Sequence, residues 1–407
     1  MNIFVLLIIA MAIIIFFMRK KVAVGKCLII GGLFMWAVRS LNPELLLISG
    51  KEMLLLPRTY DLMFSLYFVM CLEIELRTSG VLSDMVSALQ RIFSSGKAIL
   101  AVMPGFLGLL PSVGGARFSA PIVDEGCRNM IASAEEKAAI NFWFRHPFEF
   151  SNPIIPGMIM ACSVTGIGYG DFVIHTAWVT VVCILTGWAM LIAPLKYKSG
   201  AAGAKENEVS GDEGSFRDVI LAVSPIIITF LLVVFADMAS SAAMGISVLL
   251  IYAVLSMMGK EISLAKAVKG AMDGKMFLNI ACILYFIQLL TETGILNEII
   301  EAFQSAPLPI PVIIAGISII VGILTGMSQA HVAIVMPIVA AVMPGNLDLA
   351  AVAMVFGTAG QMITPTHVCF TVTTDYFNAD FLTVLKKMVL IEIIVLTIFS
   401  VITYIMW

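Results

Sequence analysis

Charged residues are scarce in this chain. Only 13% of its 407 residues carry a charge, against roughly 25% in an average soluble domain. Hydrophobic residues make up 60%, and this proportion excludes a water-soluble protein of this size. Because one bilayer-spanning helix takes about 20 mostly apolar residues, the apolar content would fill on the order of ten to thirteen spans.

The sequence also lacks the usual signatures of enzymes and metal sites. Its seven cysteines form no CxxC pair, its four histidines show no HExxH spacing, and neither GxxxxGK[ST] nor GxSxG occurs. We therefore expect no ATP hydrolysis, no resident metal, no cofactor and no enzymatic activity. With 24 basic and 27 acidic residues, the chain is slightly acidic, and nucleic acid is not an expected partner.

Long runs of Ala, Leu, Ile, Val and Met are present instead, without the alternation of barrel strands, and they predict transmembrane helices. The first run, residues 2–18, is followed by Arg19, Lys20 and Lys21. This order is the reverse of a signal peptide, so the run is predicted to stay as a first membrane helix. Since basic residues concentrate in cytoplasmic loops, the N-terminus is expected outside.

An internal repeat occurs in which residues 290–296 lie 214 positions after residues 76–82. The same offset places Gly108 on Gly322, and a small deletion then brings Asn152-Pro153 onto Thr364-Pro365. Chance matching among abundant apolar residues is the alternative explanation. Each copy would hold a span, a surface helix, a second span and two broken segments.

The charges around the two predicted surface helices differ in sign. The first is flanked by Arg77, Arg91 and Lys97, whereas the second carries Glu292, Glu298 and Glu301. By the positive-inside rule the two helices lie on opposite membrane faces, which predicts inverted repeats as in many secondary transporters. The expected organisation is N-terminal transmembrane helices in 1–60, a first repeat in 61–195, a cytoplasmic linker in 196–217, connecting helices in 218–275 and a second repeat in 276–407.

Four segments combine helix breakers with small polar residues, and they are our candidates for the tips of re-entrant hairpins and for broken helices. Short polar turns between ordinary spans would look similar. Free N–H groups at such breaks attract anions, while carbonyls and hydroxyls coordinate Na⁺. The candidate substrate or ion ligands are Ser112, Gly114, Gly115 and Arg117, then Ser151, Asn152 and Pro153, then Gly326, Ser328, Gln329 and His331, and finally Thr364, Pro365 and Thr366.

Ionisable residues inside spans are costly and are therefore functional candidates. Arg117 and His331 occupy related positions in the repeat, and two cationic groups there would suit a carboxylate or phosphate. Alternatively, Arg117 extends to the membrane interface. A second group could hold a broken helix by ion pairing or relay protons, and these coupling candidates are Arg145, His146, Glu149, His367 and Asp375.

The stretches 76–121, 326–337 and 364–377 resemble the gluconate permease family and the wider ion-transporter superfamily. The whole chain is most similar to a group of prokaryotic integral membrane proteins placed in that superfamily. The resemblance implies an all-α protein of two inverted repeats, each with a re-entrant hairpin and a broken helix, an elevator-type motion, a homodimer and a location in the cytoplasmic (inner) membrane. The Ser-Asn-Thr signature of its Na⁺-coupled dicarboxylate branch is only partly kept, since Ser151-Asn152 is followed by proline.

We therefore expect a secondary active transporter of a small organic anion, a carboxylate or sugar acid, driven by an H⁺ or Na⁺ gradient. The anion and the lipid bilayer would be its main partners. A cation/H⁺ antiporter is the alternative if Glu149 or Asp375 proves indispensable and no organic substrate is found. An intramembrane enzyme or lipid carrier would instead need a cavity open to lipid and lined by Arg145, His146 and Glu149.

Replacing Arg117 or Asn152 by alanine is expected to abolish ion-gradient-driven uptake in proteoliposomes while the protein still folds. The reason is that each residue lies in a predicted break where backbone and side chain would face the substrate. Full uptake by both variants would contradict the assignment of these segments to the site.

Overall fold

The computed structural model describes residues 2–20, 22–92, 96–109, 115–198, 216–236, 238–260, 262–305, 307–365 and 367–406. These residues are almost entirely helical, as the sequence predicts. Two short strands differ from an all-α expectation, because β1 (Met130–Ile131) pairs antiparallel with β2 (Lys196–Tyr197). The predicted linker 196–217 therefore begins in a two-stranded sheet, and most of its remaining length, residues 199–215, lies outside the described residues.

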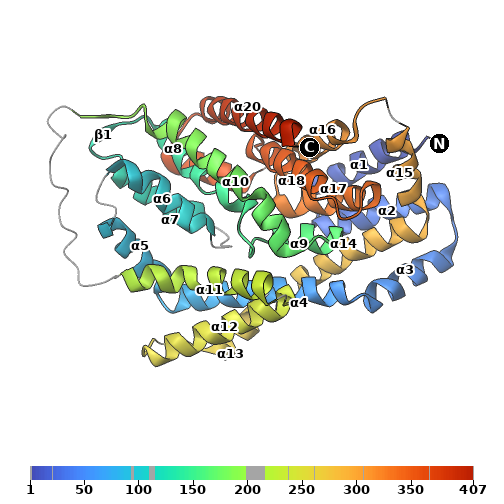
Figure 1. Cartoon of the computed structure of the whole chain (residues 1–407), viewed down its shortest axis with the longest axis horizontal. Coiled ribbons are helices and arrows are strands. Elements are labelled where there is room, and N and C mark those ends of the chain that lie inside the picture. The colour runs from blue at the N-terminus through green and yellow to red at the C-terminus, as the bar shows by residue number, and fades with distance from the viewer. Residues whose placement is uncertain are drawn as a thin grey trace.

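The helices fall into two series along the chain, one before residue 199 and one after residue 215 (Figure 1). The first series runs α1 (Ile3–Arg19), α2 (Val24–Arg39), α3 (Pro43–Leu55), α4 (Pro57–Thr78), α5 (Val81–Ile92), α6 (Gly96–Leu109), α7 (Gly115–Gly126), α8 (Ala134–Phe144), η1 (Pro147–Phe150), α9 (Pro156–Thr165), α10 (Tyr169–Gly187) and η2 (Trp188–Ile192). The second runs α11 (Phe216–Phe235), α12 (Ser240–Met257), α13 (Leu264–Ala271), α14 (Gly274–Glu292), α15 (Ile295–Gln304), α16 (Ile310–Thr325), α17 (Ser328–Val342), α18 (Leu347–Met362), α19 (Val368–Phe377) and α20 (Phe381–Met406).

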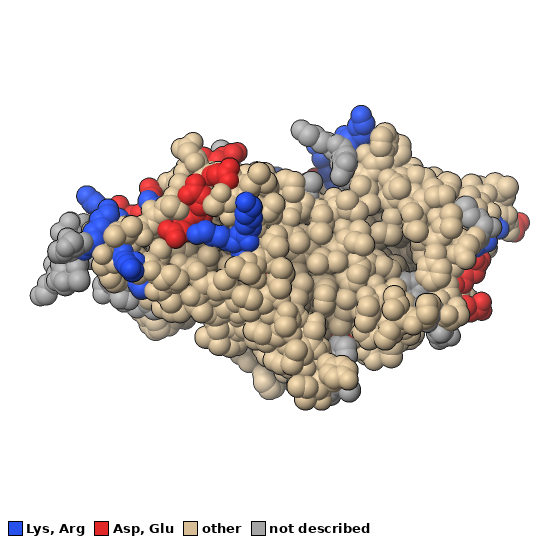
Figure 2. Space-filling model, turned by 90° about the horizontal axis from the view of Figure 1, so that it is seen from above, with Lys and Arg blue, Asp and Glu red and all other residues tan. Residues whose placement is uncertain are grey.

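The outer surface of the molecule is suited to lipid. Within the described residues, four helices are long and apolar enough to cross a membrane, at Tyr169–Ile192, Ser240–Met257, Gly274–Glu292 and Phe381–Ile405. Large apolar side chains such as Leu47, Phe235 and Met257 are exposed, which would be costly in water. Figure 2 shows charges gathered mainly toward the two ends of the molecule, with most of the face between them uncharged. A multi-pass membrane protein is thus confirmed.

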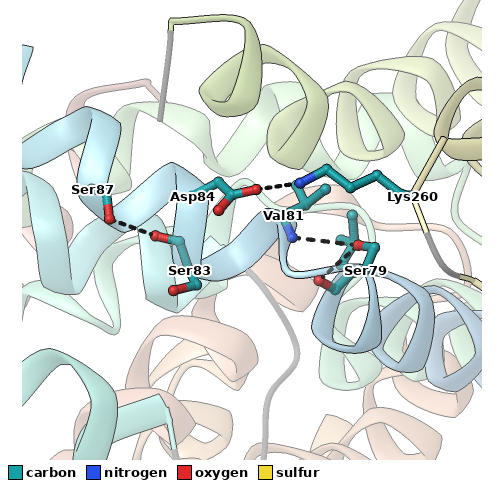
Figure 3. Close-up of polar contacts among 7 residues, drawn as sticks. Ser79, Val81, Ser83, Asp84, Ser87 and Lys260 are labelled. Carbon is teal, nitrogen blue, oxygen red and sulfur yellow. Dashed lines mark hydrogen bonds and ion pairs between the residues drawn. The ribbon is translucent and has the colours of Figure 1, made fainter. Parts of the chain in front are cut away.

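Two amphipathic helices, α5 and α15, occupy equivalent places in the two series. Each follows a glycine in the left-handed conformation, Gly80 with φ 80° and Gly294 with φ 73°, a backbone state that residues with a Cβ rarely adopt. In α5 the apolar Val81 and Met85 are buried. Its polar side is held by Asp84, whose Oδ2 lies 2.5 Å from Lys260 Nζ (Figure 3).

Close glycine contacts set the packing of each hairpin. A Cβ at Gly108 of α6 would overlap the carbonyl oxygen of Arg145, and a Cβ at Gly322 of α16 would overlap that of Gly357. α6 therefore packs on the end of α8 as α16 packs on α18. Gly108 and Gly322 match in the sequence repeat because neither position has room for a Cβ.

The two series also pack across each other. α9 lies against α17, and α19 lies against α7, so the helix after each break contacts the returning limb of the other hairpin. α10 and α20 contact each other, and each also touches α8 and α18. The breaks of both series are thereby brought to the centre of the fold (Figure 1).

The Gly322→Ala variant is expected to unfold at a lower temperature than the parent, because forcing extra volume into close packing costs about 1–3 kcal/mol. Gly316→Ala is the matched control, since a Cβ there meets nothing within 4 Å and alanine favours the helix by up to about 1 kcal/mol. Thermal unfolding in detergent measures both. Equal melting temperatures for the two variants would contradict this packing.

Candidate substrate and coupling site

Both central helices break where the sequence places prolines. α8 ends at Phe144, η1 covers Pro147–Phe150, and residues 151–155 are irregular before α9 starts at Pro156. In the second series α18 ends at Met362 and α19 begins at Val368, with Pro365 between them. Proline lacks the N–H that a continuing helix needs. The residues between the helices therefore leave backbone groups that other partners must satisfy.

Hydroxyl groups of α10 satisfy the carbonyl oxygens of the first break. The bonds are Thr176 Oγ1 to Phe150 O at 2.5 Å, Thr180 Oγ1 to Pro147 O at 2.8 Å and Tyr169 Oη to Pro153 O at 2.7 Å. Thr180 Oγ1 also lies 2.9 Å from Ser151 Oγ. These bonds are needed in a bilayer, because no water is present there to form hydrogen bonds with exposed backbone groups.

Asn152 ties the first break to the end of the first hairpin. Its Nδ2 donates to Leu109 O at 2.6 Å, and its Oδ1 accepts from Ile154 N at 3.1 Å. The second break is tied in a related way, because His367 Nδ1 lies 2.9 Å from the carbonyl oxygen of Gly326, the left-handed residue that ends α16. Asn152 is thus a positioning residue whose amide is already used within the protein.

Two buried histidines join the breaks to each other. His146 Nδ1 lies 2.7 Å from Phe142 O, and His146 Nε2 lies 3.1 Å from His367 Nε2. The Phe142 ring contacts both imidazoles, with centroid distances of 4.8 Å and 5.4 Å. We refer to His146 and His367 as the histidine pair; its members are 221 residues apart and belong to different series.

Arg145 lies beside the histidine pair at the end of α8. It is only 8% exposed, its guanidinium contacts the sulfur of Cys369, and Glu149 is a nearby opposite charge. Two of its nitrogens, Nε and Nη1, have no hydrogen-bond partner among the residues that the structure describes. A buried cation with donors to spare is a place where an anion can bind.

Glu149 and Gln361 connect the two series directly. Gln361 Nε2 donates to Glu149 Oε2 at 2.7 Å, and Gln361 follows Glu149 by the same 212 residues that separate Thr364 from Asn152. Two equivalent positions therefore touch each other. Glu392 of α20 is buried, and its charge would act on Glu149.

The predicted ligands are only partly brought together. Ser112, Gly114 and Thr366 lie outside the described residues, as does the side chain of Arg117, while Gly115 begins α7. Ser151, Asn152 and Pro153 lie in the first break, and Ser328 and Gln329 open α17, with Ser328 packed near Gly157. Thr364 is buried beside the exposed Pro365.

Two predicted residues, His331 and Asp375, lie within helices and not in the two helix breaks. His331 is fully buried in α17 and packs its ring on Gly357, and neither ring nitrogen has a hydrogen-bond partner among described residues. Asp375 is exposed near the end of α19, so the structure does not bring it to Arg145 and the histidine pair.

Sequence reasoning did not single out Gln361, Cys369 or the buried carboxylates Glu75 and Glu392. Both carboxylates interrupt apolar spans, a signal for functional residues in membranes, and the 212-residue offset would have paired Gln361 with Glu149. Cys369 offered no local signal. It lies beside Arg145 and the histidine pair because α19 packs against α8.

The sulfur of Cys369 and ring nitrogens of the histidine pair lie within 4.8 Å of one another. Arg145 contacts this sulfur and places a fixed positive charge beside it. A divalent cation would be repelled there, so we assign no metal site to these residues.

A cavity of about 410 Å³ opens beside the helix that follows the first break. Ile159, Cys162 and Ser163 of α9 line it, together with Arg58 and Asp61 from the start of α4. One side of α9 is therefore reached from outside the packed core.

The fold defines a class, a multi-pass, mostly α-helical membrane protein in which two helix breaks face each other. The solved structure of the YdaH transporter from Alcanivorax borkumensis, described as having an unusual topology, is similar with a TM-score of 0.58 and 14% identity. The match covers 88% of this chain and 86% of that chain.

The model of the family described as "Protein of unknown function (DUF401)" matches residues 2–406, and the chain belongs to the DUF401 family. No curated protein matches the sequence. Neither result bears on the predicted similarity to gluconate permeases.

Replacing Gln361 by leucine is expected to lower the melting temperature, because the Glu149 carboxylate loses its donor at a cost of about 1–3 kcal/mol. Exchanging the two residues, as Glu149→Gln with Gln361→Glu, should bring the melting temperature back close to that of the parent, since the hydrogen bond can re-form in the opposite direction. Thermal unfolding measures all three proteins. A double variant that is less stable than Gln361→Leu would contradict the pairing.

Proposed function

We propose that this protein is a secondary active transporter that carries a small organic anion, a carboxylate or sugar acid, across the cytoplasmic membrane of a prokaryote. The observation that carries the proposal is Arg145, a buried guanidinium between two helix breaks whose Nε and Nη1 have no hydrogen-bond partner among the described residues. The transporter fold of the similar structure supports it.

The chemistry of Arg145 favours a carboxylate. A guanidinium presents its N–H groups as a planar fork that matches two carboxylate oxygens, and such charged bonds are about twice as strong as neutral ones. Unpaired donors in a buried place are unfavourable. An anion that accepts hydrogen bonds from Nε and Nη1 would therefore bind favourably, because it satisfies donors that are already in place.

Alternating access would arise from movement of the two series as inverted repeats. The crossed packing of α9 on α17 and α19 on α7 supports this proposal, because moving either hairpin also moves the other break. An elevator-type motion of this central part against α4, α14 and their neighbours, in a homodimer, fits the same arrangement.

A cation/H⁺ antiporter remains the second candidate function. Glu149 and the buried Glu392 favour it, because two neighbouring carboxylates could exchange a cation for protons. This function predicts no stabilisation by organic acids and a requirement for both carboxylates.

Substitution of Arg145 tests the proposal. Arg145→Ala should reduce uptake of the transported acid by about tenfold to a hundredfold, since a hydrogen bond to a charged group contributes about 1.5–3 kcal/mol, and Arg145→Lys should retain part of it. Arg128→Ala is the control, because Arg128 lies on the surface in an exposed ion pair with Glu125. Thermal shifts with a panel of organic acids identify the substrate, and proteoliposome uptake measures transport.

Full uptake by a folded Arg145→Ala protein would contradict the site. If no organic acid stabilises the parent protein and uptake of a cation depends on Glu149 and Glu392, the antiporter is the correct function instead.

A further inference from the structure

The hydrogen bonds of the histidine pair constrain its protons. A neutral imidazole carries one N–H, so two neutral rings supply two protons. The observed geometry has three contacts to satisfy, His146 Nδ1 with Phe142 O, His367 Nδ1 with Gly326 O, and Nε2 with Nε2 at 3.1 Å. The two carbonyl oxygens can only accept.

Both Nδ1 atoms must therefore carry protons. If both rings were neutral, the two Nε2 atoms would face each other with lone pairs at 3.1 Å, which is a repulsive arrangement. A third proton on one Nε2 turns the same contact into an ordinary N–H···N hydrogen bond, with a distance in the usual range. These three contacts therefore suit a pair that holds three protons and one positive charge.

From this geometry we infer that His146 and His367 form a proton site that joins the two helix breaks in the protonated state and lets them separate when the proton leaves. The inference rests on the proposed function for its role in coupling, since it assigns H⁺ as the coupling ion. The first break favours H⁺ over Na⁺ as well, because its carbonyls at Pro147, Phe150 and Pro153 already accept hydrogen bonds from α10.

The charges around the histidine pair link the proton to the anion. Burial and the charge of Arg145 both oppose a positive charge on the pair. Glu149 of η1 is the opposite charge near Arg145, and Glu392 of α20 acts on Glu149. Cys369 of α19 faces Arg145, and His331 of α17 packs on α18. An anion on Arg145 would neutralise the opposing charge, so anion and proton bind more tightly together than alone.

Six other ionisable groups on the helices packed here are engaged in ion pairs of their own. They form ion pairs at Lys137 with Asp124 (2.6 Å), His175 with Asp348 (2.9 Å) and Lys387 with Glu136 (3.5 Å). The side chain of Arg117 on α7 lies outside the described residues.

Nitrogen NMR of protein labelled with ¹⁵N only in histidine tests the pair directly, because the chain has four histidines. The His175→Gln and His331→Gln variants assign the two remaining signals. We expect a pH range in which His146 and His367 together carry three ring protons and show N–N coupling across the shared proton. Two ring protons throughout the pH range in which the protein is folded would overturn the inference. So would displacement of the shared proton by one equivalent of Zn²⁺ or Co²⁺, which would indicate a metal site.

Transport of protons tests the coupling. His367→Asn keeps a donor near the Nδ1 position for Gly326 O but removes Nε2, so it should fold, bind the acid and lose acid-driven H⁺ influx at least tenfold. His175→Asn is the matched control and should retain the influx. If H⁺ influx persists in His367→Asn, the inference is wrong and the anion transporter stands. If the pair shares a proton but no acid is transported, the proposed function fails and the proton site stands.

Discussion

The central constraint on this fold is that a helix broken inside a bilayer must find hydrogen-bond partners within the protein. The first break meets it with three hydroxyls from α10, and Asn152 adds a bond to the end of α6. The second break uses an imidazole, His367, for the equivalent link to the end of α16. The other ring nitrogen of His367 faces His146, so the proposed proton site adjoins the second tie, whereas the amide of Asn152 does not titrate.

The same constraint explains why the two series meet through side chains of unlike chemistry. Glu149 and Gln361 occupy equivalent positions and bond to each other, an arrangement that two identical acids could hold only by sharing a proton. Arg145, in contrast, has Gly357 as its equivalent. The carbonyl oxygen of Arg145 lies against Gly108, and that of Gly357 lies against Gly322. At this position the first series therefore carries a guanidinium, whereas in the second series the His331 ring packs on the glycine.

The sequence predicted the features that have strong local causes. Glycines in the left-handed conformation at Gly80 and Gly294, and close approaches at Gly108 and Gly322, leave visible marks at a constant spacing. Prolines marked both breaks, and low charge marked the membrane. These effects act within a few residues, so composition and spacing reveal them.

Features that depend on packing between distant segments were not predictable. The pairing of Glu149 with Gln361 was hidden because the spacing between equivalents changes from 214 to 212 residues after the hairpin. Cys369 reaches Arg145 only through the packing of α19 on α8. Asp375 is exposed, although along α19 it lies only about two helical turns from His367. The strands β1 and β2 are two residues each, too short for an alternating pattern.

Together, the two proposals require an organic anion and a proton to bind together at the two facing breaks. Calorimetry of acid binding to the purified protein, repeated in buffers with different ionisation enthalpies, counts the protons taken up with each anion. We expect uptake of about one proton for each anion bound, because Arg145 and the histidine pair are electrostatically linked. Binding of the acid with no uptake of protons at any pH would contradict it.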